Sequence, residues 1–295
     1  MRTDNLHFTR RSFLGAVAGV TACSLLPRGA WGADGAKPDS KFNGVQIGVI
    51  TYSYRSMPGS AEDILKYVVE CGINSIELMG DPAEKFAKAH AGADGKDVIA
   101  GYADLRKLYN DAGVNIDVIK FGNIGDKKMS DEQVEEYFQA AKAVGAKAIT
   151  RELSEDAARR LGPIADKHQI MIGFHNHTQI KTNTYDGDVL SYGKHLGINL
   201  DIGHYVAATG ESPIPVIEKH RDRMVSLHLK DRKKNNGPNE PWGQGDTPIA
   251  EVLQYMKKNQ LTFPAEIELE YKIPADSDAV KEVQKCVKFC KDALA

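Results

Sequence analysis

The second half of the chain contains five apolar runs that each end in a side chain able to bind a metal or move a proton: AKAITRE (146–152), MIGFHNH (171–177), GINLD (197–201), MVSLH (224–228) and EIE (266–268). Strands that are buried on both faces, as in an all-parallel sheet, read as unbroken apolar runs. When helices separate such strands, the residues at their carboxyl ends meet at one edge. The five runs therefore predict a parallel sheet whose polar strand ends share one site.

Strands and helices alternate along the whole chain after its first 43 residues. We expect strands at 45–54, 75–79, 115–121, 146–152, 171–177, 224–231 and 263–270, and one within 197–205 that ends at Asp201. Helices are predicted at 61–71, 81–91, 98–112, 131–144, 154–168, 186–195, 213–220, 248–259 and 276–293. Eight such units in roughly 250 residues are typical of the α/β class and of a single (β/α)8 TIM barrel. An open doubly wound sheet would need a glycine-rich phosphate turn after its first strand, and none follows here.

Residues 1–32 have the features of an export signal. Arg10 and Arg11 precede a short, mildly apolar stretch at 15–26, and small residues at 30–32 resemble a cleavage site. This arrangement is typical of a twin-arginine signal, which moves folded proteins out of the cytoplasm. We therefore expect a periplasmic protein.

The same region allows a second interpretation, because residues 20–23 resemble a lipoprotein cleavage box. Lipidation of Cys23 would anchor the protein to a membrane, although the small residues downstream favour soluble export. After the signal, residues 33–43 are predicted to be a linker and residues 44–295 to be the barrel.

Composition limits the class of partner. The net charge of -2 and the pI near 6.5 give no overall attraction to nucleic acid or anionic membranes, and they leave a homo-oligomer open. Outside the signal the cysteines are Cys71, Cys286 and Cys290, which match no zinc motif and are too few for a disulfide framework. We expect buried free thiols, with a bridge from Cys71 to one of the others as the alternative.

Four of the expected strand ends carry Glu152, Asp201, His228 and Glu268. Any one acidic residue could be a solvated strand end, but four such residues at matching positions favour a shared site. Burying three carboxylates together without a cation costs free energy through repulsion and desolvation. Three carboxylates and one imidazole suit Mn2+, Mg2+ or Co2+ and can accept Zn2+. The sequence therefore predicts a divalent metal site at the barrel mouth, with Mn2+ preferred.

Three polar residues near these strand ends are candidates for substrate binding. His177 could bind substrate, be a further ligand or be structural. His204 follows Asp201 by three residues and could bond a substrate hydroxyl or shuttle a proton. Lys230 could stabilise a developing oxyanion, or it could pair only with Asp231.

Aromatic residues and one further acid complete the predicted site. Tyr52, Tyr54 and Trp242 offer flat faces on which a sugar ring could stack, although single aromatic residues more often serve packing. Glu77, on the second strand, could form a hydrogen bond with substrate. The expected partner is thus a small-molecule sugar.

Six motifs of the chain resemble the sugar phosphate isomerase/epimerase superfamily, which has the xylose isomerase-like TIM barrel: TYSYR (51–55), FHNH (174–177), NLDIGH (199–204), LHLKD (227–231), GQG (243–245) and IELE (267–270). The likeness extends from about residue 45 to the C-terminus. The order of the DIGH and HLKD motifs is specific for the family but not for one reaction.

The resemblance implies a role for each of the four strand-end residues. Related ketose epimerases hold their metal with glutamate, aspartate, histidine and glutamate, which places the ligands at Glu152, Asp201, His228 and Glu268. The resemblance further implies that Glu152 and Glu268 are proton-transfer bases beside a carbonyl. Because an exported protein rarely meets sugar phosphates, we expect a divalent-metal-dependent isomerase or epimerase acting on an unphosphorylated sugar or keto-sugar.

Three other functions are alternatives to a sugar isomerase or epimerase. A lyase or hydratase acting on a 3-keto-glycoside begins with the same proton abstraction, so the sequence does not separate it. A non-catalytic periplasmic carbohydrate-binding protein would not need both predicted bases. An endonuclease-IV-like enzyme would need extra histidines after the second and third strands, where Met79 and Phe121 stand, and a basic groove.

Overall fold

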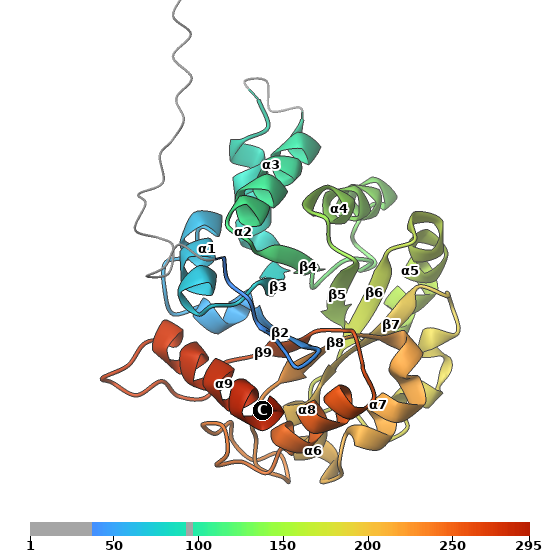
Figure 1. Cartoon of the computed structure of the whole chain (residues 1–295). Coiled ribbons are helices and arrows are strands. Elements are labelled where there is room, and N and C mark those ends of the chain that lie inside the picture. Colours follow the sequence, from blue (N-terminus) through green and yellow to red (C-terminus); the bar gives the residue numbers. More distant parts are fainter. Residues whose placement is uncertain (1–36, 93–96) are drawn as a thin grey trace, which may run out of the picture.

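The computed structural model describes residues 37–92 and 97–295, so the predicted signal at 1–32 lies outside the described residues. Eight parallel strands form a closed barrel with helices around it (Figure 1). They are β2 (Val45–Ile50), β3 (Ser75–Met79), β4 (Asn115–Lys120), β5 (Ala148–Glu152), β6 (Met171–His175), β7 (Leu196–Asp201), β8 (Met224–Leu229) and β9 (Ala265–Ile267). Strand β2 pairs with both β3 and β9, which closes the sheet. The predicted single (β/α)8 barrel is confirmed.

The helices also follow the predicted alternation. They are α1 (Ala61–Glu70), α2 (Gly80–Ala89), α3 (Val98–Asp111), α4 (Asp131–Val144), α5 (Glu155–His168), α6 (Ile202–Thr209), α7 (Ile214–His220), α8 (Ile249–Lys258) and α9 (Ala279–Leu294). Serine side chains at positions 60, 130 and 154 cap α1, α4 and α5 by accepting a backbone N–H from the first turn. Within residues 37–92 and 97–295, no helix has both the length and the apolar character needed to cross a bilayer.

The end of the predicted linker belongs to the sheet. Strand β1 (Lys41–Phe42) pairs with the start of β2 in antiparallel fashion. Asn43 and Gly44 connect them with positive φ angles of 47° and 92°. Asparagine and glycine tolerate that conformation, which explains why a tight hairpin can form here.

The predicted helix at 186–195 is wrong. The structure has only two short 3-10 turns in this region, at Thr184–Asp186 and Asp188–Leu190. Gly187 and Gly193 weaken helix formation here. The backbone of Gly193 also packs directly on Gly162 of α5, where a Cβ would come within 2.8 Å of the Gly162 Cα. Close packing of α5 on this segment takes the place of a regular outer helix.

Strand β7 ends at Asp201, as predicted, and α6, which was not predicted, begins immediately after it. The Asp201 side chain caps α6 by accepting the backbone N–H of His204 at 2.7 Å. A capping carboxylate satisfies one of the unpaired donors of the first helical turn. The strand-to-helix change therefore occurs at Asp201, which anchors this residue at the barrel mouth.

Candidate active site

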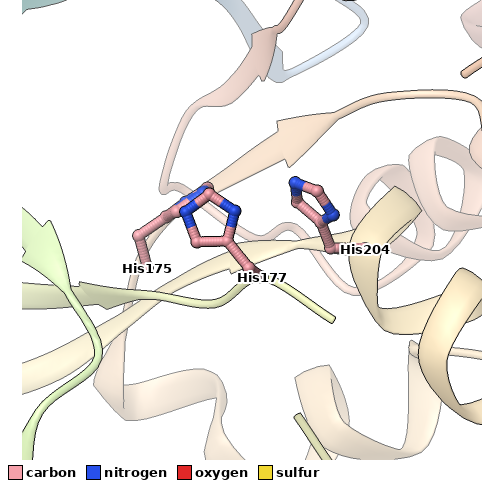
Figure 2. A group of neighbouring side chains, drawn as sticks. All are labelled: His175, His177 and His204. Atoms are coloured by element: carbon pink, nitrogen blue, oxygen red, sulfur yellow. The ribbon is translucent and has the colours of Figure 1, made fainter. Parts of the chain in front are cut away.

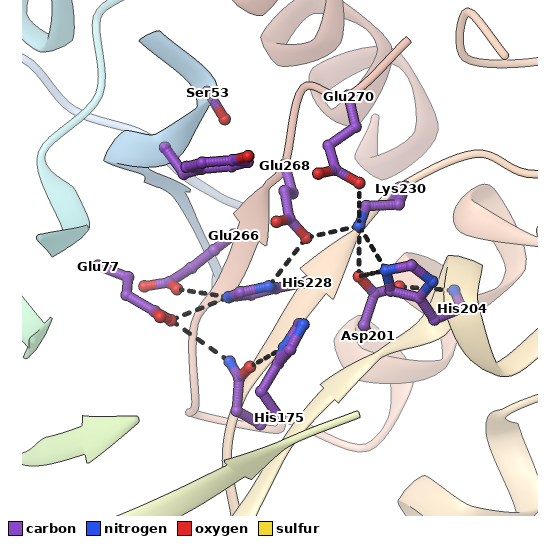
Figure 3. A network of polar contacts seen from close by, with 12 residues as sticks. Ser53, Glu77, His175, Asp201, His204, His228, Lys230, Glu266, Glu268 and Glu270 are labelled. Atoms are coloured by element: carbon purple, nitrogen blue, oxygen red, sulfur yellow. Dashed lines mark hydrogen bonds and ion pairs between the residues drawn. The ribbon is translucent and has the colours of Figure 1, made fainter. Parts of the chain in front are cut away.

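Four buried side chains meet at the carboxyl-terminal mouth of the barrel: His175, Asp201, His228 and Glu268 (Figure 3). The first two end β6 and β7, the third lies near the end of β8, and the fourth directly follows β9. Parallel pairing places them side by side, because Asp201 is the register partner of His228. One ligand atom from each of the four lies within 4.8 Å of those from the others. We call these four residues the cation group.

The cation group includes three of the four predicted ligands and replaces Glu152 with His175. Glu152 is the register partner of His175 on the neighbouring strand. Its Oε1 lies 3.0 Å from Lys120 Nζ and its Oε2 lies 2.7 Å from His177 Nε2. These two contacts outweigh burial and keep the pKa of Glu152 below its ordinary value. The structure thus brings Glu152 to the mouth but not into the cation group.

A buried ammonium group lies among three carboxylates of the site. Lys230 Nζ lies 2.9 Å from Asp201 Oδ2, 3.0 Å from Glu268 Oε2 and 2.7 Å from Glu270 Oε2. Burial lowers the pKa of Lys230, but the three carboxylates outweigh burial and raise that pKa above its ordinary value. Asp231, the alternative partner considered for Lys230, instead accepts backbone N–H groups of the loop at Gly243 and Gly245.

The cation group fits a divalent metal ion. Such ions bind imidazole nitrogen and carboxylate oxygen at roughly 2.0–2.2 Å, which puts opposite ligand atoms about 4 Å apart. His228 Nδ1 lies only 3.0 Å from Glu268 Oε2, a distance that requires a proton or a cation between two lone pairs. With two imidazoles among the ligands, the set suits Mn2+, Co2+ or Zn2+ better than Mg2+.

Three histidine rings lie close together at the mouth, those of His175, His177 and His204 (Figure 2). The ring centroids are 5.0 Å apart for His175 and His177 and 4.8 Å apart for His177 and His204. His204 Nδ1 accepts a hydrogen bond from Arg232 Nη1 at 2.7 Å, and its Nε2 lies 3.0 Å from Lys230 Nζ. Burial, then Lys230, lowers the pKa of His204 to about 3. An uncharged imidazole suits a hydrogen bond to a substrate hydroxyl better than proton donation.

The predicted aromatic residues do not gather around the cation group. Tyr54 is buried in the core, with its hydroxyl 3.4 Å from Cys71 Sγ, so it cannot stack on a sugar. Trp242 packs edge-to-face on Phe289 of α9 at 5.6 Å. The guanidinium of Arg55 covers one face of the Tyr52 ring at 4.5 Å. Tyr52 is nevertheless 38% exposed, so the rest of its surface is accessible to a ligand.

Cys71, Cys286 and Cys290 are buried free thiols, as expected.

Sequence reasoning missed three residues that shape the site. His175 stands at the end of β6, the position that Asp201 holds on β7, and that equivalence was the available signal. Lys120 lies in no motif, and Glu270 ends the IELE motif but was given no role there. They become part of the site only because the barrel brings Glu152 and Lys230 beside them.

The fourth ligand can be decided by two matched substitutions. His175→Gln is expected to lower Mn2+ affinity by more than about 10-fold, because it removes a ligand. Glu152→Gln is expected to leave that affinity close to the wild-type value, since Glu152 lies in a separate ion pair. Isothermal titration calorimetry on the two variants measures this, and the reverse ranking would restore Glu152 as the ligand.

Comparisons with known proteins agree with this architecture. The family model of the xylose isomerase-like TIM barrel matches residues 65–292. Solved structures of similar fold include the following three. A probable 3-DHS dehydratase, AsbF, of Bacillus anthracis, involved in petrobactin synthesis, has 16% identity and a TM-score of 0.64 over 83% of this chain and 98% of its own. A xylose isomerase domain protein of Alicyclobacillus acidocaldarius has 14% identity and a TM-score of 0.65 over 85% of this chain and 99% of its own.

The third is a sugar phosphate isomerase/epimerase of Parabacteroides distasonis, with 19% identity and a TM-score of 0.55 over 83% of this chain and 93% of its own. Curated proteins give no sequence match. At these identities the solved structures support the fold alone. The family model covers most of the barrel, and the chain therefore belongs to the xylose isomerase-like TIM barrel family.

Proposed function

We propose that this chain is a divalent-cation-dependent enzyme that removes a proton beside the carbonyl of an unphosphorylated sugar or keto-sugar, giving isomerisation or epimerisation. The observation that carries the proposal is the cation group, four buried donors whose ligand atoms lie within 4.8 Å of one another. Members of the family act on small sugars, and a sugar phosphate isomerase/epimerase shares the fold. We propose Mn2+ as the preferred cation.

The cation, when bound, would polarise the carbonyl and the neighbouring hydroxyl of the substrate. This would acidify the C–H bond on the carbon next to the carbonyl. Glu268 is the proposed base. Lys230 and His228 outweigh burial and keep the pKa of Glu268 well below its ordinary value, so this side chain is a carboxylate that can accept the proton. Glu152 is the proposed partner that returns a proton to carbon. It takes that proton from His177, whose Nε2 lies 2.7 Å from Glu152 Oε2 and whose side chain is 54% exposed to solvent, and Lys120 orients it from the other oxygen.

Substrate binding is assigned to side chains that stand at the mouth beside the cation group. The His177 side chain is 54% exposed and stands over the site, where it can bond a substrate hydroxyl. His204 offers an uncharged imidazole beside Lys230, whose ammonium can stabilise negative charge that develops on the substrate oxygen. Tyr52 provides an exposed ring for the sugar face.

A second candidate reaction is elimination or hydration on a 3-keto-glycoside. A probable 3-DHS dehydratase shares the fold, which favours an elimination as the alternative. Both reactions begin when a base takes the proton beside a carbonyl. They differ in the next step, because elimination breaks a C–O bond at the β-carbon, whereas isomerisation returns the proton to carbon.

The reaction can be tested with deuterium exchange. The chelated and Mn2+-loaded chains are incubated in D2O with a panel of unphosphorylated keto-sugars and a 3-keto-glucoside, and the products are analysed by NMR. We expect deuterium at one carbon only in the loaded chain, and no exchange in Glu268→Gln. Release of the aglycone would establish the lyase, and binding without exchange in any sugar would support a non-catalytic binding protein.

We further propose that residues 1–32 direct export to the periplasm and that Cys23 is not lipidated. Replacing Arg10 and Arg11 together with lysine is expected to retain the protein in the cytoplasm, because the twin-arginine pathway reads that pair. Cell fractionation measures the distribution. A Cys23→Ser variant is the matched control, and its release from membranes would instead establish a lipid anchor.

A further inference from the structure

A layer of polar side chains lies inside the barrel, one step below the cation group. Asn199 and Glu266 stand two residues before Asp201 and Glu268, so they point to the same interior face nearer the amino ends of the strands. The complete layer consists of Glu77, Thr150, Asn199, Ser226 and Glu266, each with no exposed surface. Buried polar groups cost free energy unless they are hydrogen-bonded. The hydrogen bonds of this layer therefore indicate how the side chains of the cation group above it are oriented.

Glu77 directly contacts one of the two imidazoles of the cation group, that of His228. His228 Nε2 lies 2.9 Å from Glu77 Oε2 (Figure 3). Thr150 Oγ1 donates to Glu77 Oε1 at 2.6 Å. An ionised carboxylate only accepts hydrogen bonds, so Nε2 of His228 must carry the hydrogen. Nδ1, which faces Glu268 Oε2 at 3.0 Å, is then the nitrogen that can give its lone pair to a cation, in place of the proton that it shares with Glu268.

Glu77 is linked to the other imidazole, that of His175, through the side-chain amide of Asn199. His175 Nδ1 lies 2.7 Å from Asn199 Oδ1. The amide is oriented by its nitrogen, which donates to Ser226 Oγ at 2.6 Å and approaches Glu77 Oε2 at 3.4 Å. The amide oxygen can only accept, so His175 Nδ1 carries its hydrogen and Nε2 keeps a lone pair for the mouth.

We infer that Glu77 is the positioning residue of the cation group: by direct contact with His228, and through Asn199 with His175, it sets which nitrogen of each ring faces the ion. The inference rests on the proposed cation site and assigns Glu77 a place beneath it instead of a contact with substrate. Outer partners of this kind orient metal-bound histidines and make them stronger ligands.

The chain offers a matched control in Glu266. Its carboxyl group is as deeply buried as that of Glu77 and lies 3.8 Å from His228 Nε2, beyond hydrogen-bond distance. Neither carboxyl oxygen of Glu266 has a hydrogen-bond partner among the described residues. Glu266→Gln therefore keeps the shape of the buried side chain and removes no hydrogen bond from His228.

The first test measures Mn2+ affinity of the full chain by isothermal titration calorimetry. Glu77→Gln keeps a weaker acceptor and is expected to lose about 10-fold in affinity, whereas Glu77→Met has no comparable acceptor and is expected to lose about 100-fold. Glu266→Gln should stay close to the wild-type value. Equal losses in Glu77→Gln and Glu266→Gln would overturn the inference, because they would indicate a general packing defect. Thermal unfolding of the cation-free variants shows whether each one folds.

The second test uses NMR of the cation-free protein to determine which ring nitrogens of His228 and His175 carry hydrogen. In protein labelled with 15N-histidine, we expect slowly exchanging, hydrogen-bonded imidazole N–H signals from His228 Nε2 and His175 Nδ1. The His228 signal should be lost in Glu77→Met and kept in Glu266→Gln. If it persists in Glu77→Met, Glu77 does not position the ring. Should the wild type bind no Mn2+, the proposed function fails, while these signals still decide the role of Glu77.

Discussion

Replacing Asp201 with asparagine is expected to lower the Mn2+ affinity of the chain by at least about 100-fold, since even outer-shell changes cost roughly 10–100-fold. The substitution removes a charge that is fully buried and 2.9 Å from Lys230 Nζ. It preserves the cap of α6, because the amide oxygen can still accept the His204 N–H. The loss should therefore arise at the cation group and not from unfolding. Calorimetric titration with Mn2+ measures the affinity, and deuterium exchange into the substrate should fall with it.

Asp117→Asn is the control for this substitution. Asp117 is also a barrel aspartate, but its oxygens accept hydrogen bonds from Ser75 and Lys147, towards the amino ends of the strands. We expect wild-type Mn2+ affinity in that variant. If Asp201→Asn also binds Mn2+ normally, the cation group is not the metal site, and the proposed function loses its main support.

Replacing Lys230 with methionine is expected to lower the free energy of unfolding of the cation-free protein by about 3–5 kcal/mol, the usual cost of removing one member of a buried ion pair. Lys230 is 2% exposed, and its ammonium contacts three carboxylates, from Asp201, Glu268 and Glu270. Without it these negative charges face one another. Mn2+ should then stabilise the variant more than the wild type, because the ion supplies the missing positive charge. Urea denaturation with and without Mn2+ measures both effects.

A lysine at the opposite end of the barrel provides the comparison. Lys147 pairs with Asp117, but its side chain is 83% exposed. Exposed ion pairs contribute little to stability, so Lys147→Met should unfold close to the wild type. Wild-type stability in Lys230→Met without cation would mean that the three carboxylates are protonated or hydrated there. The assignment of Lys230 as their counter-charge would then be wrong.

Most of the fold could be predicted because it depends on local patterns. Apolar runs of strand length alternate with amphipathic segments that begin at a capping serine, and these signals lie within a few residues of one another. The segment at 186–195 was wrongly predicted to be a helix, for a reason that is not local. Its backbone packs directly on α5 at Gly162, a contact between residues about thirty positions apart that leaves no periodic signal.

The site could be predicted only in part. Asp201, His228 and Glu268 were identifiable because each stands at a strand end and parallel strands align their ends. The choice between Glu152 and His175 was not identifiable, because the two are register partners at the same level of the barrel. The aromatic predictions failed likewise at Tyr54, whose ring turns into the core beside Cys71.

By itself, the sequence determined the closed parallel barrel and the ends of the strands on which the site is built, since burial and periodicity are properties of contiguous residues. Only the tertiary structure decided which strand-end side chains come together in the cation group and which pair elsewhere. Lys120 draws Glu152 into a separate ion pair, while Asn199 and Glu77 orient His175 and His228 from below. Those choices depend on charges and hydrogen bonds between residues as far apart as 151 positions, which no local pattern records.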